Sequence, residues 1–208
     1  MLDIDLFLES TPRTRVARSP TVVLKKDDIL LDTPPKPKVN KSKRKGNSYE
    51  NKIAKQLGRW IFNDEVMLNR SITSGAVKTN YLGDIVPQKP LPWKDSEFPF
   101  LIECKNGYAN QASDFNNTTL LDTWLLKLLK ERTEDQPIIW LIVSFHAHQP
   151  LFITDLELTI KSNIILKEVY NGRFELFYIY KLKELFEYDF YYLYKNNLEL
   201  MKIFNRII

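Results

Sequence analysis

An apolar run that ends in an acid and a base two residues apart constrains this chain most. Phe98-Pro99-Phe100-Leu101 leads through Ile102 into Glu103-Cys104-Lys105-Asn106, and a β-strand directs residues i and i+2 to the same face. Residues 98–106 are therefore predicted to form a strand on which Glu103 and Lys105 lie side by side, roughly 7 Å apart at about 3.3 Å rise per residue. Ile102 and Cys104 are predicted to point into the core, which gives Cys104 a packing role.

A second acid follows a glycine upstream of this strand. Gly83 permits a sharp backbone bend before Asp84, and the apolar pair Ile85-Val86 comes next. If the two segments pair, Asp84 approaches Glu103. Two carboxylates can share a hard divalent cation, and an adjacent lysine can polarise a water or offset phosphate charge, as in metal-dependent phosphodiester hydrolysis. The alternative is a structural Glu–Lys pair beside an ordinary turn aspartate.

The composition is that of a globular protein with an uneven charge distribution. Of the 208 residues, 44% are hydrophobic and 12% are aromatic, which suits one domain with extensions. The net charge is only +4, but bases far outnumber acids between Arg13 and Lys45. The single cysteine excludes an intramolecular disulfide, and no run is apolar enough to span a membrane. We therefore expect an intracellular protein without a membrane partner.

Residues 1–40 are predicted to form a basic, flexible N-terminal arm. Pro34-Pro35-Lys36-Pro37-Lys38 is typical of an extended, solvated linker. One interpretation is a solubilising tail. The other is an arm that neutralises nucleic-acid phosphates, which would make binding salt-dependent.

A helix is predicted to begin at Asn47 or Ser48, because Ile53, Leu57, Trp60 and Ile61 recur at helical spacing. Glu50 lies in its predicted first turn. An acid there can complement the helix dipole or can be delivered toward a site that the helix faces. A basic cluster precedes the helix, and we expect it to hold phosphates: Lys41, Lys43, Arg44 and Lys45.

A small polar loop follows a predicted extended segment at residues 66–72. The residues that could contact a phosphate here are Arg70, Ser71, Ser74 and Lys78. Their cations, hydroxyls and amides suit such a role, although surface loops commonly have this composition.

The remaining elements predict the fold class. Residues 118–132 have the apolar spacing of a helix, residues 137–145 are a continuous apolar run typical of a strand buried on both faces, and residues 151–153 form a further strand. The order of helices and strands predicts an α/β fold with a mixed central sheet flanked by helices.

The C-terminal residues 156–208 are predicted to form an aromatic-rich α+β extension. Asn171-Gly172 between two apolar runs predicts a hairpin, and helices are expected from Lys181 and from about Asp189. For the aromatic side chains of this extension, a role in packing or in a dimer interface is favoured over stacking on unpaired bases. His146 and His148 lack the further ligands that a zinc site requires.

Several of these features, in this order, resemble the PD-(D/E)XK nuclease superfamily. They are Glu50 on the first helix, Gly83-Asp84-Ile85, and Ile102-Glu103-Cys104-Lys105 followed by a helix and a strand. The basic segment, Arg70-Ser71 and Glu103-Cys104-Lys105-Asn106 are similar to archaeal Holliday-junction resolvases and related phage endonucleases. The resemblance predicts a nuclease core at residues 41–155, between the arm (1–40) and the extension (156–208). Gly83 stands where the superfamily pattern has proline.

The resemblance implies a role for each matching residue. Asp84 and Glu103 would be the main Mg²⁺ ligands, with Mn²⁺ able to substitute, and Glu50 would be a further ligand. Lys105 would orient or activate the attacking water. The match of Ser71 or Ser74 to the loop serine of these enzymes is loose.

The function expected from the resemblance is a Mg²⁺-dependent DNA endonuclease that acts on branched or structured DNA as a homodimer. It would work in the cytoplasm, that of the host cell if a phage encodes it. Two alternatives remain open. One is a sequence-specific homing or restriction-like endonuclease, and the other is a non-catalytic nucleic-acid-binding protein on a nuclease fold.

Overall fold

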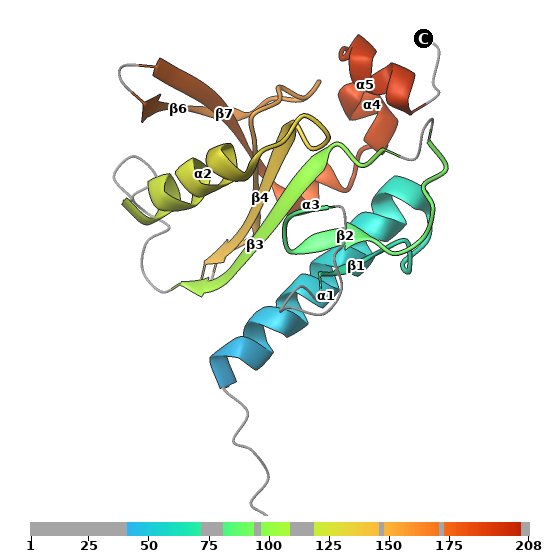
Figure 1. The fold of residues 1–208 in the computed structure, drawn as a ribbon, viewed down its shortest axis with the longest axis horizontal. Coiled ribbons are helices and arrows are strands. Elements are labelled where there is room, and N and C mark those ends of the chain that lie inside the picture. The colour runs from blue at the N-terminus through green and yellow to red at the C-terminus, as the bar shows by residue number, and fades with distance from the viewer. Residues whose placement is uncertain are drawn as a thin grey trace, which may run out of the picture. The chain divides into compact units, whose positions relative to one another are not determined.

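A computed structural model describes residues 41–71, 81–93, 97–108, 119–145, 148–170 and 173–204. These described residues belong to one compact unit. Its elements are α1 (Lys41–Phe62), β1 (Leu68–Arg70), β2 (Ile85–Pro87), β3 (Phe100–Tyr108), α2 (Thr119–Glu131), β4 (Ile138–Phe145), β5 (Leu151–Thr154), β6 (Asn163–Tyr170), β7 (Arg173–Lys181), α3 (Leu182–Leu185), α4 (Phe190–Tyr194) and α5 (Leu198–Ile203) (Figure 1).

The strands of the described chain form a small and a large sheet. β1 and β2 pair as an antiparallel ribbon, and the large sheet has the order β3-β4-β5-β7-β6. β3 and β4 are parallel and are joined through α2, whereas the other neighbours are antiparallel. This mixed sheet flanked by helices confirms the predicted α/β class.

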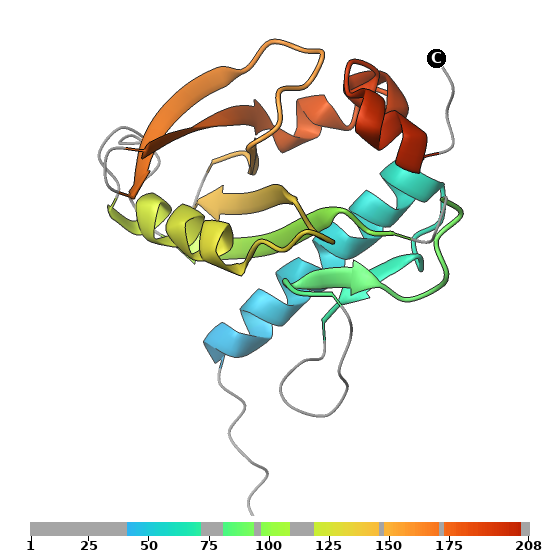
Figure 2. The same cartoon turned by 45° about the horizontal axis from the view of Figure 1, so that its top comes forward.

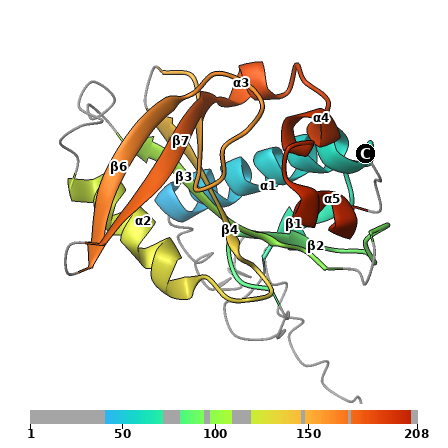
Figure 3. The ribbon, with the colours of Figure 1, turned by 90° about the horizontal axis from the view of Figure 1, so that it is seen from above.

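Helices cover both faces of the large sheet (Figures 2 and 3). Alternate residues of β3 divide between two apolar clusters, because a strand directs successive side chains to opposite faces. Phe100, Ile102 and Cys104 pack with α1, α4 and α5, whereas Leu101 packs with α2. Every residue of β4 except Ser144 is buried, as its apolar run predicts.

The C-terminal aromatic residues pack mainly into the first of these clusters. Phe190, Tyr194 and Phe204 contact the ring of Phe100, which stacks on Trp140 at a centroid distance of 3.9 Å. The predicted packing role is therefore confirmed for Phe190 and Tyr194. β6 and β7 extend the same sheet that begins with β3, and the boundary at residue 155 stays a prediction.

Two predicted element boundaries are wrong. α1 already includes Lys41 instead of beginning at Asn47 or Ser48, because lysine and arginine are good helix formers and one internal glycine costs only about 1 kcal/mol. In place of two C-terminal helices, the described chain has three short ones. Asp189 and Asn197 interrupt them, since each accepts a hydrogen bond from a backbone N–H as an N-cap.

Other predictions fall outside the described residues. These concern the arm at residues 1–40, Ser74, Lys78, His146 and the turn at Asn171-Gly172. β6 and β7 do pair antiparallel on either side of that turn. Among the helices of the described part, none is long and apolar enough to cross a membrane.

Candidate active site

The segment that carries Asp84 lies along the outer edge of β3. Gly83 forms a parallel bridge with Ile102, and the Asp84 N–H donates to the Ile102 carbonyl at 2.7 Å. Gly83 has φ +98°, and a Cβ built on it would lie 2.5 Å from the Ile102 carbonyl oxygen. Only glycine accommodates both this conformation and this close approach.

A buried glutamine also holds this segment. Gln136 is 1% exposed, and its Oε1 accepts the Leu82 N–H at 2.7 Å. Its Nε2 donates to the carbonyls of Leu82 and Phe100, at 3.2 and 2.8 Å. Gln136 therefore ties the residue before Gly83 to the beginning of β3 and positions Asp84.

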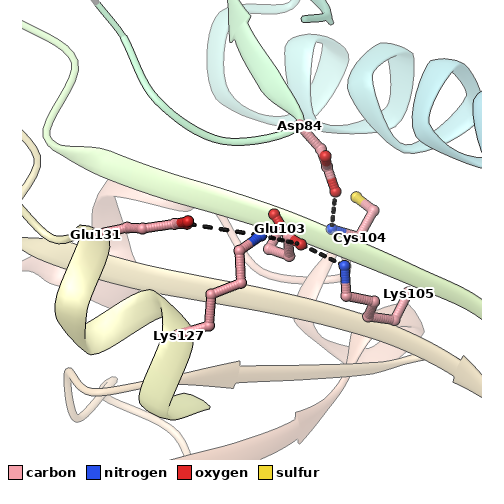
Figure 4. A network of polar contacts seen from close by, with 6 residues as sticks. All are labelled: Asp84, Glu103, Cys104, Lys105, Lys127 and Glu131. Atoms are coloured by element: carbon pink, nitrogen blue, oxygen red, sulfur yellow. Dashed lines mark hydrogen bonds and ion pairs between the residues drawn. The ribbon is translucent and has the colours of Figure 1, made fainter. Parts of the chain in front are cut away.

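The Asp84 carboxylate points at the β3 backbone beside Glu103. Its Oδ2 accepts the backbone N–H of Cys104 at 2.8 Å (Figure 4). Burial and the negative charge of Glu103 raise the pKa of Asp84 to about 6, against the opposing effects of the Cys104 N–H and Lys105. The position therefore concentrates negative charge, which a bound cation would offset.

Two ammonium groups flank the Glu103 carboxylate, whose residue is only 4% exposed. Lys105 donates to Oε1 from the same face of β3, as the spacing predicts. Lys127 of α2 donates to the same oxygen at 3.1 Å and lies 3.7 Å from Glu131 (Figure 4). Burial lowers the pKa of Lys127, but the carboxylates of Glu103 and Glu131 together raise it by more. The pKa of Lys127 is therefore above its ordinary value.

Glu50 of α1 lies near the site and forms an ion pair with Arg70 of β1. Its Oε2 lies 3.9 Å from Nε of Arg70. The backbone N–H of Ser71, next to Arg70, donates to the Asp84 carbonyl at 2.7 Å, so the end of β1 joins α1 to the Asp84 segment. Burial raises the pKa of Glu50, Arg70 lowers it and Glu103 raises it, with a net increase.

Cys104 points to the opposite face of β3 from Glu103 and Lys105 and is buried. Burial raises the pKa of its thiol well above the ordinary value, and Asp84 and Glu50 add to this effect. The protonated thiol is a poor nucleophile, so the geometry agrees with the predicted packing role.

The residues present fit a hard divalent cation. Asp84 and Glu103 offer carboxylate oxygens, the ligands that Mg²⁺ and Mn²⁺ prefer. Within the residues described here, no group of three or more His, Cys, Asp and Glu side chains is close enough to hold a metal ion. A ligand role for Asp84, Glu103 and Glu50 therefore stays a prediction.

Basic side chains line a pocket next to the site. The cavity measures about 490 Å³, and its lining consists of Lys41, Arg44, Lys45, Ser48, Tyr49, Lys52 and Asn106. Asn106 directly follows Lys105 on β3. Three of the four basic residues predicted to hold phosphates are thus part of one surface, whereas Lys43 is not among the lining residues.

Sequence reasoning missed Lys127 and Gln136. Lys127 is three residues after the buried Trp124 of α2, so it borders the apolar stripe of a predicted helix. A signal for Lys127 was therefore present, because residues at the edge of such a stripe lie next to the sheet. Gln136 follows α2 in a turn, and nothing in its sequence context distinguishes it.

A protein family described as phage putative PDDEXK endonuclease matches residues 41–202. No curated protein and no solved structure matches the chain.

Replacing Gly83 tests how the Asp84 segment is held. We expect Gly83→Ala to lower the free energy of unfolding by about 2–4 kcal/mol, because its Cβ would collide with the Ile102 carbonyl and its φ is unfavourable for alanine. Gly46→Ala is the control, since a Cβ there meets only Glu50 Oε1 at 3.7 Å. That change should raise stability by about 0.5–1 kcal/mol within α1. Urea denaturation measures the free energy of unfolding of both variants. Equal values for Gly83→Ala and Gly46→Ala would contradict the close approach of Gly83 to the Ile102 carbonyl.

The raised pKa of Asp84 predicts a pH-dependent cost in stability. The folded state binds more protons than the unfolded state between the ordinary pKa of 3.8 and about 6, so stability is lost as the pH rises through this range. In EDTA at about pH 7.5, Asp84→Asn should raise the free energy of unfolding by about 1–3 kcal/mol, and near pH 4 the gain should vanish.

Asp64→Asn is the matched control for this prediction. The Val66 N–H and Lys89 lower the pKa of Asp64, so its neutralisation should not stabilise the protein at either pH. Denaturant titrations of the two variants at both pH values provide the comparison. A destabilised Asp84→Asn at neutral pH would refute the charge argument.

Proposed function

Because the chain belongs to this family, and hence to the PD-(D/E)XK nuclease superfamily, we propose that it is a divalent-cation-dependent DNA endonuclease. The observation that supports this best is the meeting of Asp84, Glu103 and Lys105 at one edge of β3. Branched DNA is the proposed substrate, cut in the manner of a Holliday-junction resolvase. Paired nicks in a junction require two active sites, so we propose a homodimer.

Asp84 and Glu103 would hold the cation, which we propose is Mg²⁺ with Mn²⁺ as a substitute. When bound, such a cation polarises a phosphodiester and lowers the pKa of a water molecule. The Cys104 N–H fixes one Asp84 oxygen and leaves the other carboxylate oxygen for a ligand role. Glu50 would complete the negative charge of the site from α1.

Lys105 would orient the attacking water and accompany its proton loss. Its ammonium group is held by Glu103, and its side chain is 19% exposed, so it keeps contact with solvent while its direction is fixed. The positive charge beside the water favours the hydroxide form. No covalent intermediate with the protein is required.

The pocket beside α1 would hold phosphates that flank the cut. Lys41, Arg44, Lys45 and Lys52 line it without a carboxylate among the lining residues. Lysine and arginine contacts to phosphates position a nucleic acid without reading its bases, which suits a substrate recognised by its branched shape. Arg70, Ser71, Ser74 and Lys78 are proposed as further contacts, and Lys43 as a peripheral one.

Cleavage of defined DNA molecules tests the activity and its substrate together. We expect the wild type to nick a labelled four-way junction symmetrically with Mg²⁺ or Mn²⁺ and not with EDTA. Asp84→Asn and Lys105→Met should each lose about a hundredfold or more in rate, because they remove a cation ligand and the group that orients water. Lys130→Met, an exposed change on α2, should retain the wild-type rate.

The other outcomes distinguish the remaining functions. Cutting of linear duplex at one position would favour the sequence-specific enzyme. Tight DNA binding without cleavage of junction, flap, single-stranded or duplex DNA would refute the nuclease proposal and leave a binding protein.

Salt dependence of DNA binding tests the pocket beside α1. For Arg44→Gln/Lys52→Gln, the slope of log K against log salt should fall by about 1.8, since each phosphate contact contributes about 0.9. The control is Lys161→Gln/Lys183→Gln, which removes the same charge from exposed positions outside this pocket. Lys43→Gln should change the slope less than Arg44→Gln alone or Lys52→Gln alone. Fluorescence anisotropy with EDTA measures these slopes, and equal slopes for both double variants would exclude the pocket.

A further inference from the structure

Glu103 has one more cationic partner than the motif around it supplies. Lys105 comes from the same strand, but Lys127 enters from α2 and donates to the same Oε1 at 3.1 Å. The Glu103 side chain is 5% exposed, whereas the Lys127 side chain is 49% exposed. A lysine that is half in solvent thus has its charged group on the candidate cation ligand (Figure 4).

Lys127 also has a second partner within reach. Glu131 is one helical turn further along α2, and its Oε2 lies 3.7 Å from the Lys127 Nζ. The Glu131 side chain is 42% exposed, so it lies on the solvent side of the site. A change of rotamer can move the Lys127 ammonium group away from Glu103 and toward Glu131 without moving α2.

The two partners matter because Lys127 and a divalent cation would compete for Glu103. Both are positive and both require the carboxylate oxygens, so binding of the cation would repel the ammonium group. Lys105 is different, since its side chain is only 19% exposed and its strand packs on both faces. Lys127 is the partner that can leave.

We propose that Lys127 is a second, exchangeable lysine of the site. It neutralises Glu103 in the cation-free protein and contacts a DNA phosphate when the cation has taken Glu103. This inference rests on the proposed nuclease function. A displaced Lys127 remains beside the carboxylates, where the negative charge of the phosphate to be cut would lie, and Glu131 holds it there until DNA arrives.

Cation binding without DNA gives the first test. Lys127→Met keeps the length of the side chain and removes its charge, and it should bind Mn²⁺ about two- to fivefold more tightly in a calorimetric titration, the range of a half-exposed ion pair. The control is Lys130→Met, because Lys130 takes part in neither the Lys127–Glu103 nor the Lys127–Glu131 ion pair. Its Mn²⁺ affinity should match that of the wild type. A structural role alone predicts unchanged or weaker Mn²⁺ binding for Lys127→Met, and this result would overturn the proposal.

DNA binding gives the second test, with a labelled duplex as the probe. In Ca²⁺, the slope of log K against log salt should be smaller for Lys127→Met than for the wild type by about 0.9, the loss of one phosphate contact. In EDTA the two slopes should be equal, because Glu103 retains Lys127. Equal slopes in Ca²⁺ would overturn the phosphate contact.

Glu131→Gln provides a variant whose folding is not at risk, since the residue is on the exposed side of α2. It removes the second partner of Lys127, so Mn²⁺ should bind about twofold more weakly, and an unchanged affinity would overturn the exchange. These titrations contain no DNA. If they succeed while the wild type cleaves no DNA, the proposed function fails and the competition at Glu103 stands; if cleavage occurs with unchanged Mn²⁺ affinities, the reverse holds.

Discussion

The contact between Gly83 and Ile102 determines the geometry of the candidate site. It brings a peptide against the β3 edge at a distance that no side chain would permit, and the Asp84 N–H then pairs with the Ile102 carbonyl. Gln136 extends this pairing back to Leu82 with both atoms of its amide. Asp84 is consequently positioned by backbone contacts and by the buried amide of Gln136, and its carboxylate accepts the Cys104 N–H beside Glu103.

Such an arrangement concentrates negative charge, and the surrounding structure must oppose the repulsion. Burial and Glu103 raise the pKa of Asp84, so the site is costly when it is fully ionised and free of cations. Lys105, Lys127 and Arg70 offset part of this cost as counter-ions. Apolar side chains pack on both faces of β3, so the strand that carries Glu103 is fixed in the core.

The alternation of residues along one strand and the composition of its flanking elements were enough to predict much of the site. The alternation of strand side chains predicted that Glu103 and Lys105 share one face and that Cys104 points into the core. Gly83 predicted a bend before Asp84. The apolar stripe of α2 places Lys127 next to the sheet, but local patterns identify neither its partner Glu103 nor the role of Gln136. These contacts depend on the rotation of α2 and on the parallel register of β3 with β4. The predicted start of α1 was wrong for a related reason. A residue that caps helices well does not mark a helix start when the residues before it also favour helix.

The direction of β3 relates the carboxylates to the basic pocket. From Ile102 the strand presents Glu103, then Lys105, and then Asn106 at the pocket rim. At Gly107 its pairing with β4 shifts register, and φ +88° with no Cβ lets the Lys45 ammonium group lie against the strand, where a Cβ would be 2.7 Å away. The Lys45 ammonium group of the pocket thus lies against the same strand that carries Glu103 and Lys105. A DNA backbone that follows β3 would therefore pass from the carboxylates to the cations of α1, which is the order that cutting one phosphate while holding its neighbours requires.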